Sequence, residues 1–152
     1  MTATSPKNPT PWAQGLGYGG LIPFVALALA VWLQDPADRV HSLSALLGYS
    51  ATILSFLGAI HWGLAMREAS SQSVGLLVWG VTPSLVAWVA LLLDPAVGLF
   101  LVAAALWGCF AVDWMVYPKF GVRTWLPMRL LLTMVASLSC IAGAMRVMSV
   151  TP

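Results

Sequence analysis

The chain has 152 residues, of which 60% are hydrophobic and only 8% are charged, and its formal net charge is +2. Soluble domains carry about 25% charged residues, so a chain of this composition could not cover its own surface with polar groups. The composition therefore places the protein in a lipid bilayer, with no room for a soluble catalytic domain. The small and scattered positive charge argues against nucleic acid as a partner.

Five apolar runs reach the ~20 residues that a bilayer-crossing helix needs. These runs are Trp12–Leu33, Ser42–Met66, Ser73–Leu93, Pro95–Tyr117 and Thr124–Met148. The sequence thus predicts an all-α fold, a polytopic membrane helix bundle with five transmembrane helices. One five-helix domain, residues 12–148, lies between an N-terminal tail, residues 1–11, and a C-terminal tail, residues 149–152.

Two Asp-Pro-Ala sequences predict tight turns between neighbouring helices. Asp35 can serve as an N-cap with Pro36 at the first helical position, and Asp94 and Pro95 repeat that arrangement. The second helix can therefore begin ahead of the apolar run at Ser42. Both turns would then be short helical hairpins.

Lys and Arg placement predicts the orientation, because cytoplasmic loops carry the excess of basic residues. One side of the predicted bundle holds Lys7, Arg67, Lys119 and Arg123, and the other holds Arg39 and Arg146. We therefore expect a cytoplasmic N-terminus and a periplasmic C-terminus. The N-terminal stretch lacks the Arg-rich pattern of a mitochondrial transit peptide, so a bacterial inner membrane is the expected location.

A weak internal repeat relates the first two spans to the third and fourth. "GLIPFVA" at residues 20–26 is matched by "GVTPSLVA" at residues 80–87, and "AIHW" at 59–62 is matched by "AVDW" at 111–114. Parallel repeats occur in membrane transporters, although such short matches also arise by chance in apolar sequence. A 2+2 repeat with a fifth helix added would place His61 and Asp113 at equivalent positions facing each other.

Three strongly polar side chains lie well inside the spans: His61, Asp113 and Arg129. Each is six residues from a basic residue at the cytoplasmic side, which is roughly 9 Å along a helix at 1.5 Å per residue. Their depths therefore match, and we predict that they converge on one side of the bundle. Small or polar residues share their helical faces, which suits a bundle interior: Ala105, Cys109 and Tyr117 with Asp113, and Thr133, Ser137 and Cys140 with Arg129.

Pro23 and Pro83 each remove a helical hydrogen bond inside a span. Each frees a carbonyl one turn earlier, near a preceding glycine. Two outcomes are open at both positions: a simple kink, or a broken helix that lines a site.

Several stretches together resemble a known family: "GLIPF", "ILSFLGAIHWG", "TPSLVAWVALLL" and "MRLLLTMVASLS". They are similar to the family called domain of unknown function 3429, the transmembrane protein 69-like membrane proteins, and the resemblance spans nearly the whole chain. It implies a small multi-span membrane protein. It implies no activity and supplies no functional residues.

Chemical motifs are lacking, since the sequence has no HExxH, GxSxG, P-loop or GxGxxG pattern. His41 and His61 are twenty residues apart on one predicted helix, roughly 30 Å, so they cannot ligate one haem. We therefore expect no cofactor, no metal site and no catalytic residue.

The simplest interpretation of Asp113 and Arg129 is a structural ion pair that offsets the ~2.5–3.5 kcal/mol cost of a charge at mid-membrane. The functional hypothesis is a non-enzymatic protein whose polar cluster binds a lipophilic ligand, either a quinone or an anionic lipid, or docks a partner membrane protein. The ligand-binding or network residues would be His61, Asp113, Arg129, Trp62, Trp114, Tyr117, Thr133 and Ser137. The alternative is a proton- or ion-coupled small transporter, working alone or as a homo-oligomer, in which Asp113 and His61 titrate.

Overall fold

The computed structural model describes residues 8–67 and 73–149 of the chain. Within these residues five helical segments are long and apolar enough to cross a membrane, so the predicted all-α, five-span bundle is confirmed. The α-helices are α1 (Pro11–Gly19), α2 (Leu21–Leu33), α3 (Pro36–Arg67), α4 (Ser73–Leu92), α5 (Pro95–Val116) and α6 (Leu126–Met148). Two short 3-10 helices, η1 (Tyr117–Phe120) and η2 (Arg123–Trp125), connect α5 to α6.

Both Asp-Pro turns form helix starts, as predicted. The Asp94 carboxylate accepts a hydrogen bond from the Ala96 backbone N–H at 3.0 Å, and α5 begins at Pro95. Helix α3 begins at Pro36, ahead of the apolar run, and the Asp35 carbonyl accepts from the Arg39 N–H. Each turn therefore joins two antiparallel helices through a short link.

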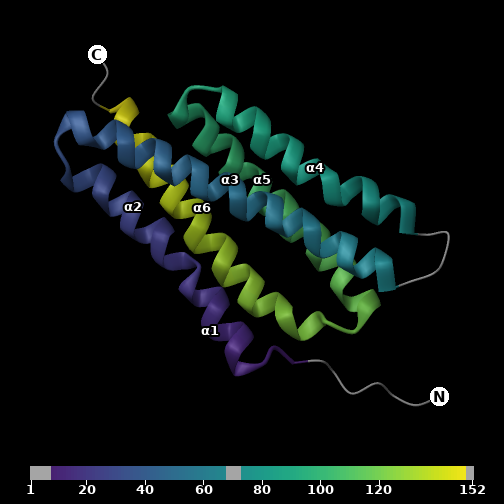
Figure 1. Ribbon diagram of the computed structural model, residues 1–152. Coiled ribbons are helices and arrows are strands. Elements are labelled where there is room, and N and C mark those ends of the chain that lie inside the picture. The colour runs from purple at the N-terminus through teal and green to yellow at the C-terminus, as the bar shows by residue number, and fades with distance from the viewer. Residues whose placement is uncertain (1–7, 68–72, 150–152) are drawn as a thin grey trace, which may run out of the picture.

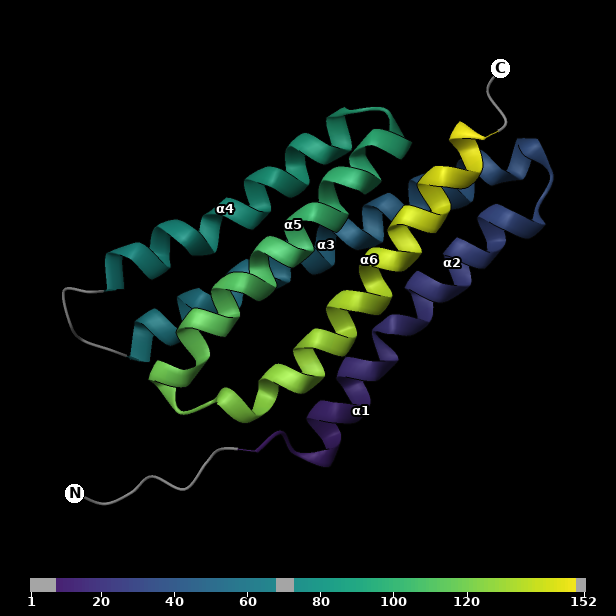
Figure 2. The ribbon, with the colours of Figure 1, turned by 180° about the vertical axis from the view of Figure 1, so that it is seen from behind.

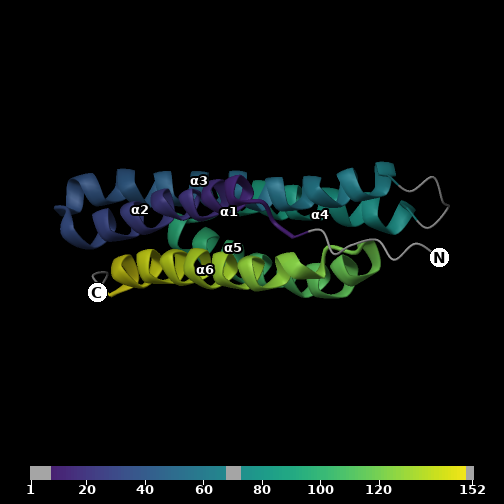
Figure 3. The same cartoon turned by 90° about the horizontal axis from the view of Figure 1, so that it is seen from below.

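The helices lie in two layers, with α2, α3 and α4 in one and α5 and α6 in the other (Figure 3). Helix α3 contacts α2, α4, α5 and α6, so it is the central helix of the bundle. Seen from either side, α1 and the start of α6 lie at the same end of the bundle, and α6 finishes at the other end (Figures 1 and 2).

Small residues let the helices approach closely at the end of the bundle that holds the Asp94–Pro95 turn. Any Cβ added at Gly98 would collide with the Ala90 carbonyl of α4. A Cβ at Gly143 would come within 2.8 Å of the Leu46 side chain of α3. These glycines admit the neighbouring helices into contact, which is the usual packing solution inside a membrane.

The first span is interrupted at one residue, because α1 ends at Gly19 and α2 begins at Leu21, but Gly20 keeps helical dihedral angles (φ −63°, ψ −15°), so the span is kinked there and not broken. Pro23 has no N–H to offer the carbonyl four residues earlier, and the Tyr49 hydroxyl of α3 donates to the Gly20 carbonyl at 2.8 Å. Pro83, by contrast, stays inside an unbroken α4, where the Thr82 hydroxyl donates to the Val78 carbonyl at 3.1 Å. The two prolines thus have different outcomes.

Candidate functional site

An ion pair between α5 and α6 forms the centre of the site. The Arg129 Nε–H donates to Asp113 Oδ2 at 2.8 Å, and Arg129 Nη2 lies 2.7 Å from the same oxygen. Both side chains are buried, with 2% of Asp113 and 7% of Arg129 exposed. Because both close contacts go to Oδ2, the other carboxylate oxygen remains available to a third group.

His61 of α3 takes up that position. Its Nε2 lies 3.4 Å from Asp113 Oδ1, and its Nδ1 lies 3.3 Å from the Leu57 carbonyl oxygen of its own helix. The Nε2 contact is long and poorly directed, and this nitrogen makes no hydrogen bond there. We therefore treat it as an electrostatic contact rather than a hydrogen bond.

Both ring nitrogens of His61 face oxygen acceptors. A neutral imidazole has one N–H and can donate to only one of them, whereas an imidazolium could donate to both. The ring of Trp79 from α4 packs against His61 in a T-shaped arrangement, with ring centroids 6.4 Å apart. His61 thus joins α3 to the α5–α6 pair and is sealed from the lipid.

The three polar residues that the matched depths single out therefore come together from three helices. The internal repeat, which would explain why His61 and Asp113 face each other, stays a prediction. Across the described residues no group of three or more His, Cys, Asp or Glu side chains could hold a metal ion.

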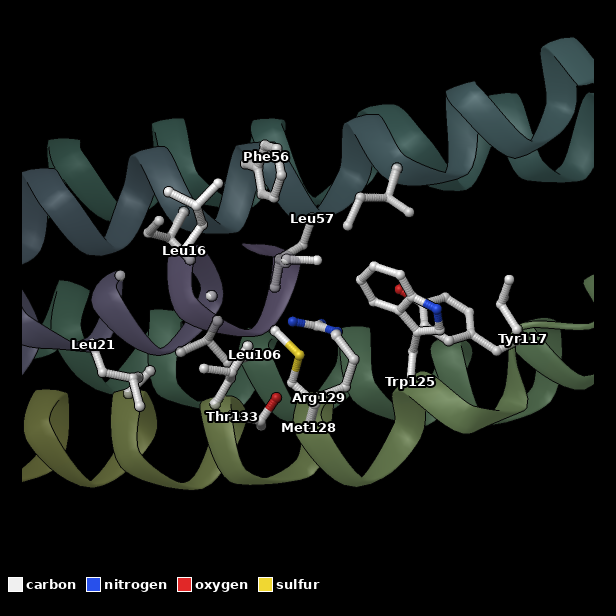
Figure 4. Close-up of a pocket in the computed structure, with 18 of the residues that line it drawn as sticks. Leu16, Leu21, Phe56, Leu57, Leu106, Tyr117, Trp125, Met128, Arg129 and Thr133 are labelled. Carbon is white, nitrogen blue, oxygen red and sulfur yellow. The ribbon is translucent and has the colours of Figure 1, made fainter. Parts of the chain in front are cut away.

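A cavity of about 550 Å³ lies beside this cluster. Its walls come mainly from α1, α2, α3 and α6, with further residues from α5 and from the η1–η2 connection. They are almost entirely apolar, and Arg129, Thr133 and Tyr117 contribute polar groups. Met128, Arg129 and Thr133 extend from α6 on one side, while Leu16 of α1 and Phe56 and Leu57 of α3 lie opposite (Figure 4). Asp113 and His61 do not line the cavity, so Arg129 is the member of the cluster that reaches it.

The mouth of the cavity opens towards lipid. Leu16 and Phe56 line the cavity and yet are 76% and 63% exposed, so they stand at its rim on the outer surface of the bundle. The gap arises because α1 packs against α2 and α6 rather than against α3. The kinked part of the first span lines the cavity through Gly17, Gly20 and Leu21, whereas Pro83 lies outside the lining.

Trp62 and Trp114 were expected beside a ligand head group, and the structure places neither of them at the cavity. The Trp62 indole donates to the Leu77 carbonyl at 2.9 Å and packs on Gly80 of α4. Trp114 is 56% exposed on α5 and packs near Phe110. The depth of both tryptophans is compatible with the cluster, but their helical faces point elsewhere.

Ser137 also lies away from the cavity lining. Its hydroxyl accepts from the Trp107 Nε1–H at 3.2 Å and donates to the Met134 carbonyl at 3.1 Å, so it joins α5 to α6. Tyr117 and Thr133, by contrast, both line the cavity.

The apolar walls were not predicted. Leu16, Gly17, Phe24, Phe56 and Met128 all line the cavity, and as single residues in an apolar sequence they are indistinguishable from lipid-facing positions. The one usable signal was the Gly-x-x-Pro pattern at Gly20 and Pro23, which allowed for a kink or a broken helix.

Comparisons with known proteins agree with this architecture. The model of a family described as "Protein of unknown function (DUF3429)" matches residues 9–145. A protein of Xenopus tropicalis, "Transmembrane protein 69", is 39% identical over 79 residues, which cover 51% of this chain and 31% of that relative. The matched part thus spans about a third of the relative's length. No solved structure matches the chain significantly.

Proposed function

The chain belongs to the family described as protein of unknown function (DUF3429), a description that carries no activity, and we propose that this multi-pass membrane protein binds a lipophilic ligand in the cavity beside Arg129. The observation that carries the proposal is an apolar cavity of about 550 Å³ with one polar wall, open to lipid. Ligand sites commonly have volumes of ~300–1,000 Å³ and few, well-placed polar groups.

The cavity is open to the bilayer beside Leu16 and Phe56, so an apolar molecule from the membrane can occupy it. Water is a poor filler, because apolar cavities stay dry. An apolar chain that enters past Leu16 and Phe56 would fill the space from the bilayer side.

The head group of such a ligand would lie at Arg129 and Thr133, the polar part of the α6 wall. A quinone or an anionic lipid has the required division into polar head and apolar tail. Trp125 also lines the cavity and would contact the ligand. Binding without chemistry is the activity we propose, because Arg129, the charged residue of the cavity wall, is held in an ion pair with Asp113.

We place the site near the cytoplasmic leaflet of a bacterial inner membrane, with the N-terminus inside and the C-terminus outside. The support is the basic bias of the sequence, with Arg67, Lys119 and Arg123 at the end that holds the cluster. Reporter fusions at the C-terminus that are active only in the cytoplasm would contradict this orientation.

A proton- or ion-coupled transporter is the second candidate, favoured by His61, whose two nitrogens both face acceptors. Transport needs a wet route across the whole bundle. Between the cluster and the opposite end the core is instead built from fully buried apolar side chains, including Leu54, Val102 and Leu99. The route is therefore dry, and a binding site with access from one side fits these residues better.

The test is native mass spectrometry of the gently extracted protein. Ala136→Phe places a large ring in the cavity, whereas Leu138→Phe adds the same ring to a lipid-facing position of the same helix, 60% exposed. We expect the wild type and Leu138→Phe to retain a lipophile and Ala136→Phe to lose it.

Leu132→Trp also fills the cavity and provides a second variant if Ala136→Phe does not fold. A wild-type protein with no retained lipophile would contradict the proposal. So would a folded cavity-filling variant that retains as much as the wild type. Retention of a protein chain in place of a lipophile would favour a docking site instead.

A further inference from the structure

The charge of Arg129 is already matched inside the protein. Its Nε and Nη2 both lie within 2.8 Å of Asp113 Oδ2. With a neutral His61, the cluster of His61, Asp113 and Arg129 therefore has no net charge. Arg129 is the one charged residue among those that line the cavity. An anionic head group placed there would be buried in apolar surroundings without a free counter-charge, which is costly.

Thr133 supplies an unused hydrogen-bonding group in the same wall. Among the described residues, the buried serine and threonine hydroxyls are those of Ser42, Ser50, Thr133, Ser137 and Ser139. All of them except Thr133 have a hydrogen-bond partner. The Thr133 hydroxyl, on a side chain that is 2% exposed, has none within the chain. Buried hydroxyls are normally paired, so this one is free for a ligand.

Thr133 and Arg129 lie four residues apart on α6, one above the other on the same helical face. A guanidinium has five N–H donors. The Nε–H donates to Asp113 Oδ2, Nη2 lies 2.7 Å from the same oxygen without making a hydrogen bond there, and the Tyr117 hydroxyl is hydrogen-bonded to Arg129. The Thr133 hydroxyl and the Arg129 guanidinium therefore lie near each other in the α6 wall of the cavity (Figure 4), and Thr133 Oγ1 and Arg129 Nη2 have no hydrogen-bond partner in the part of the chain that the structure describes. Because these donors belong to a cluster without net charge, we expect them to favour an uncharged acceptor over an anion. A carbonyl oxygen is the simplest such acceptor.

We propose that the cavity takes a neutral lipophile whose carbonyl oxygen accepts hydrogen bonds from the Thr133 hydroxyl and the Arg129 guanidinium, and that it discriminates against anionic head groups. This inference rests on the proposed function and narrows it. The carbonyl can belong to a quinone ring or to the ester of an uncharged lipid such as a diacylglycerol. The apolar tail leaves through the rim formed by Leu16 and Phe56.

The experiment uses the full chain in phosphatidylcholine vesicles. Decylubiquinone is titrated in, and quenching of tryptophan fluorescence is followed. Trp125 lines the cavity and reports on it, so Trp125→Phe identifies its share of the signal. Dioleoylglycerol and dioleoylphosphatidylglycerol are then added as competitors, one neutral and one anionic.

We expect saturable quenching by decylubiquinone, and stronger competition from dioleoylglycerol than from dioleoylphosphatidylglycerol. Thr133→Val keeps the shape and removes the hydroxyl, so binding should weaken by about three- to tenfold, the worth of one hydrogen bond. Ser139→Ala removes a buried hydroxyl of the same helix outside the cavity, and its binding should match the wild type. Melting temperatures measured alongside show that both variants are folded.

Stronger competition by dioleoylphosphatidylglycerol than by dioleoylglycerol would overturn the inference. It would mean that the cluster carries a net positive charge, as it would with a protonated His61. Unchanged binding by folded Thr133→Val would also overturn it, since the head would then not contact that hydroxyl. If neither neutral probe binds while mass spectrometry still finds a lipophile that Ala136→Phe loses, this inference fails and the proposed function stands. If nothing is retained at all, both fail.

Discussion

The two ends of the bundle are built from similar apolar sequence and differ in how α1 and α6 pack, although α3 and α4 meet closely beside His61 as well, where a Cβ at Gly58 would collide with the Gly80 carbonyl. At the tight end, around Gly98 and Gly143, glycines admit the neighbouring helices and leave no space for a side chain. At the open end, around Arg129 and Thr133, a cavity of about 550 Å³ separates α1, α3 and α6. Apolar content therefore does not distinguish a structural region from a binding region in this protein. The fit between the helices and the placement of a few polar groups do.

The largest effect is expected at the ion pair of the open end. Asp113→Asn leaves a buried arginine without its counter-charge, and Arg129→Leu leaves a buried carboxylate. Each single change should lower the free energy of unfolding by about 3–5 kcal/mol, and the double change should recover much of that loss. Thermal unfolding in detergent measures all three. A double variant no more stable than the singles would show that the pair is not the cause.

A pair of glycine changes compares the packing of the two ends directly. Gly98→Ala drives a methyl group into the Ala90 carbonyl, which is backbone and cannot move aside, so it should cost about 1–3 kcal/mol. Gly17→Ala meets the flexible end of Met128 beside the cavity and should cost much less. Equal losses of melting temperature in the two variants would mean that the open end is as rigid as the tight end.

The local stability of the first span around Gly20 should depend on the Tyr49 side chain. Tyr49→Phe removes the hydroxyl that donates to the Gly20 carbonyl at 2.8 Å. The expected loss is about 1 kcal/mol, with faster hydrogen exchange confined to amides around residues 17–24. Tyr18→Phe, at a residue 42% exposed on α1, is the control. Uniform exchange across the whole bundle would show that Tyr49 supports more than the kink.

The smallest changes in stability are expected when either of two buried hydroxyls is removed. Ser50→Ala removes a bond to the Leu46 carbonyl at 2.6 Å and a contact with Cys140 at 3.3 Å, and should cost about 0.6 kcal/mol. Thr133→Val removes a hydroxyl with no partner in the chain, so stability without ligand should stay equal or rise. Melting curves of delipidated protein test both, and a clear loss for Thr133→Val would mean that its hydroxyl is satisfied within the fold.

Matched depth proved a sound guide to which polar residues meet. His61, Asp113 and Arg129 were selected because each lies six residues from a basic residue, and helix geometry converts such spacing into height without further knowledge. Height alone does not give direction. Trp62 and Trp114 have a suitable height, yet Trp62 faces α4 and Trp114 faces outward, because direction depends on how each helix is rotated in the bundle.

By itself, the sequence determined the solvent of this protein, its five helices, both Asp-Pro helix starts and the depth of the polar cluster. These features follow from composition and from contacts within one helix, which act over a few residues. The tertiary structure alone decided that the first span kinks at Gly20, that α1 packs on α6 instead of α3, and that Thr133 has no partner. Those outcomes depend on which faces of separate helices meet. In lipid the same apolar side chain suits a helix contact and a lipid contact almost equally, so only the complete bundle fixes where the cavity lies.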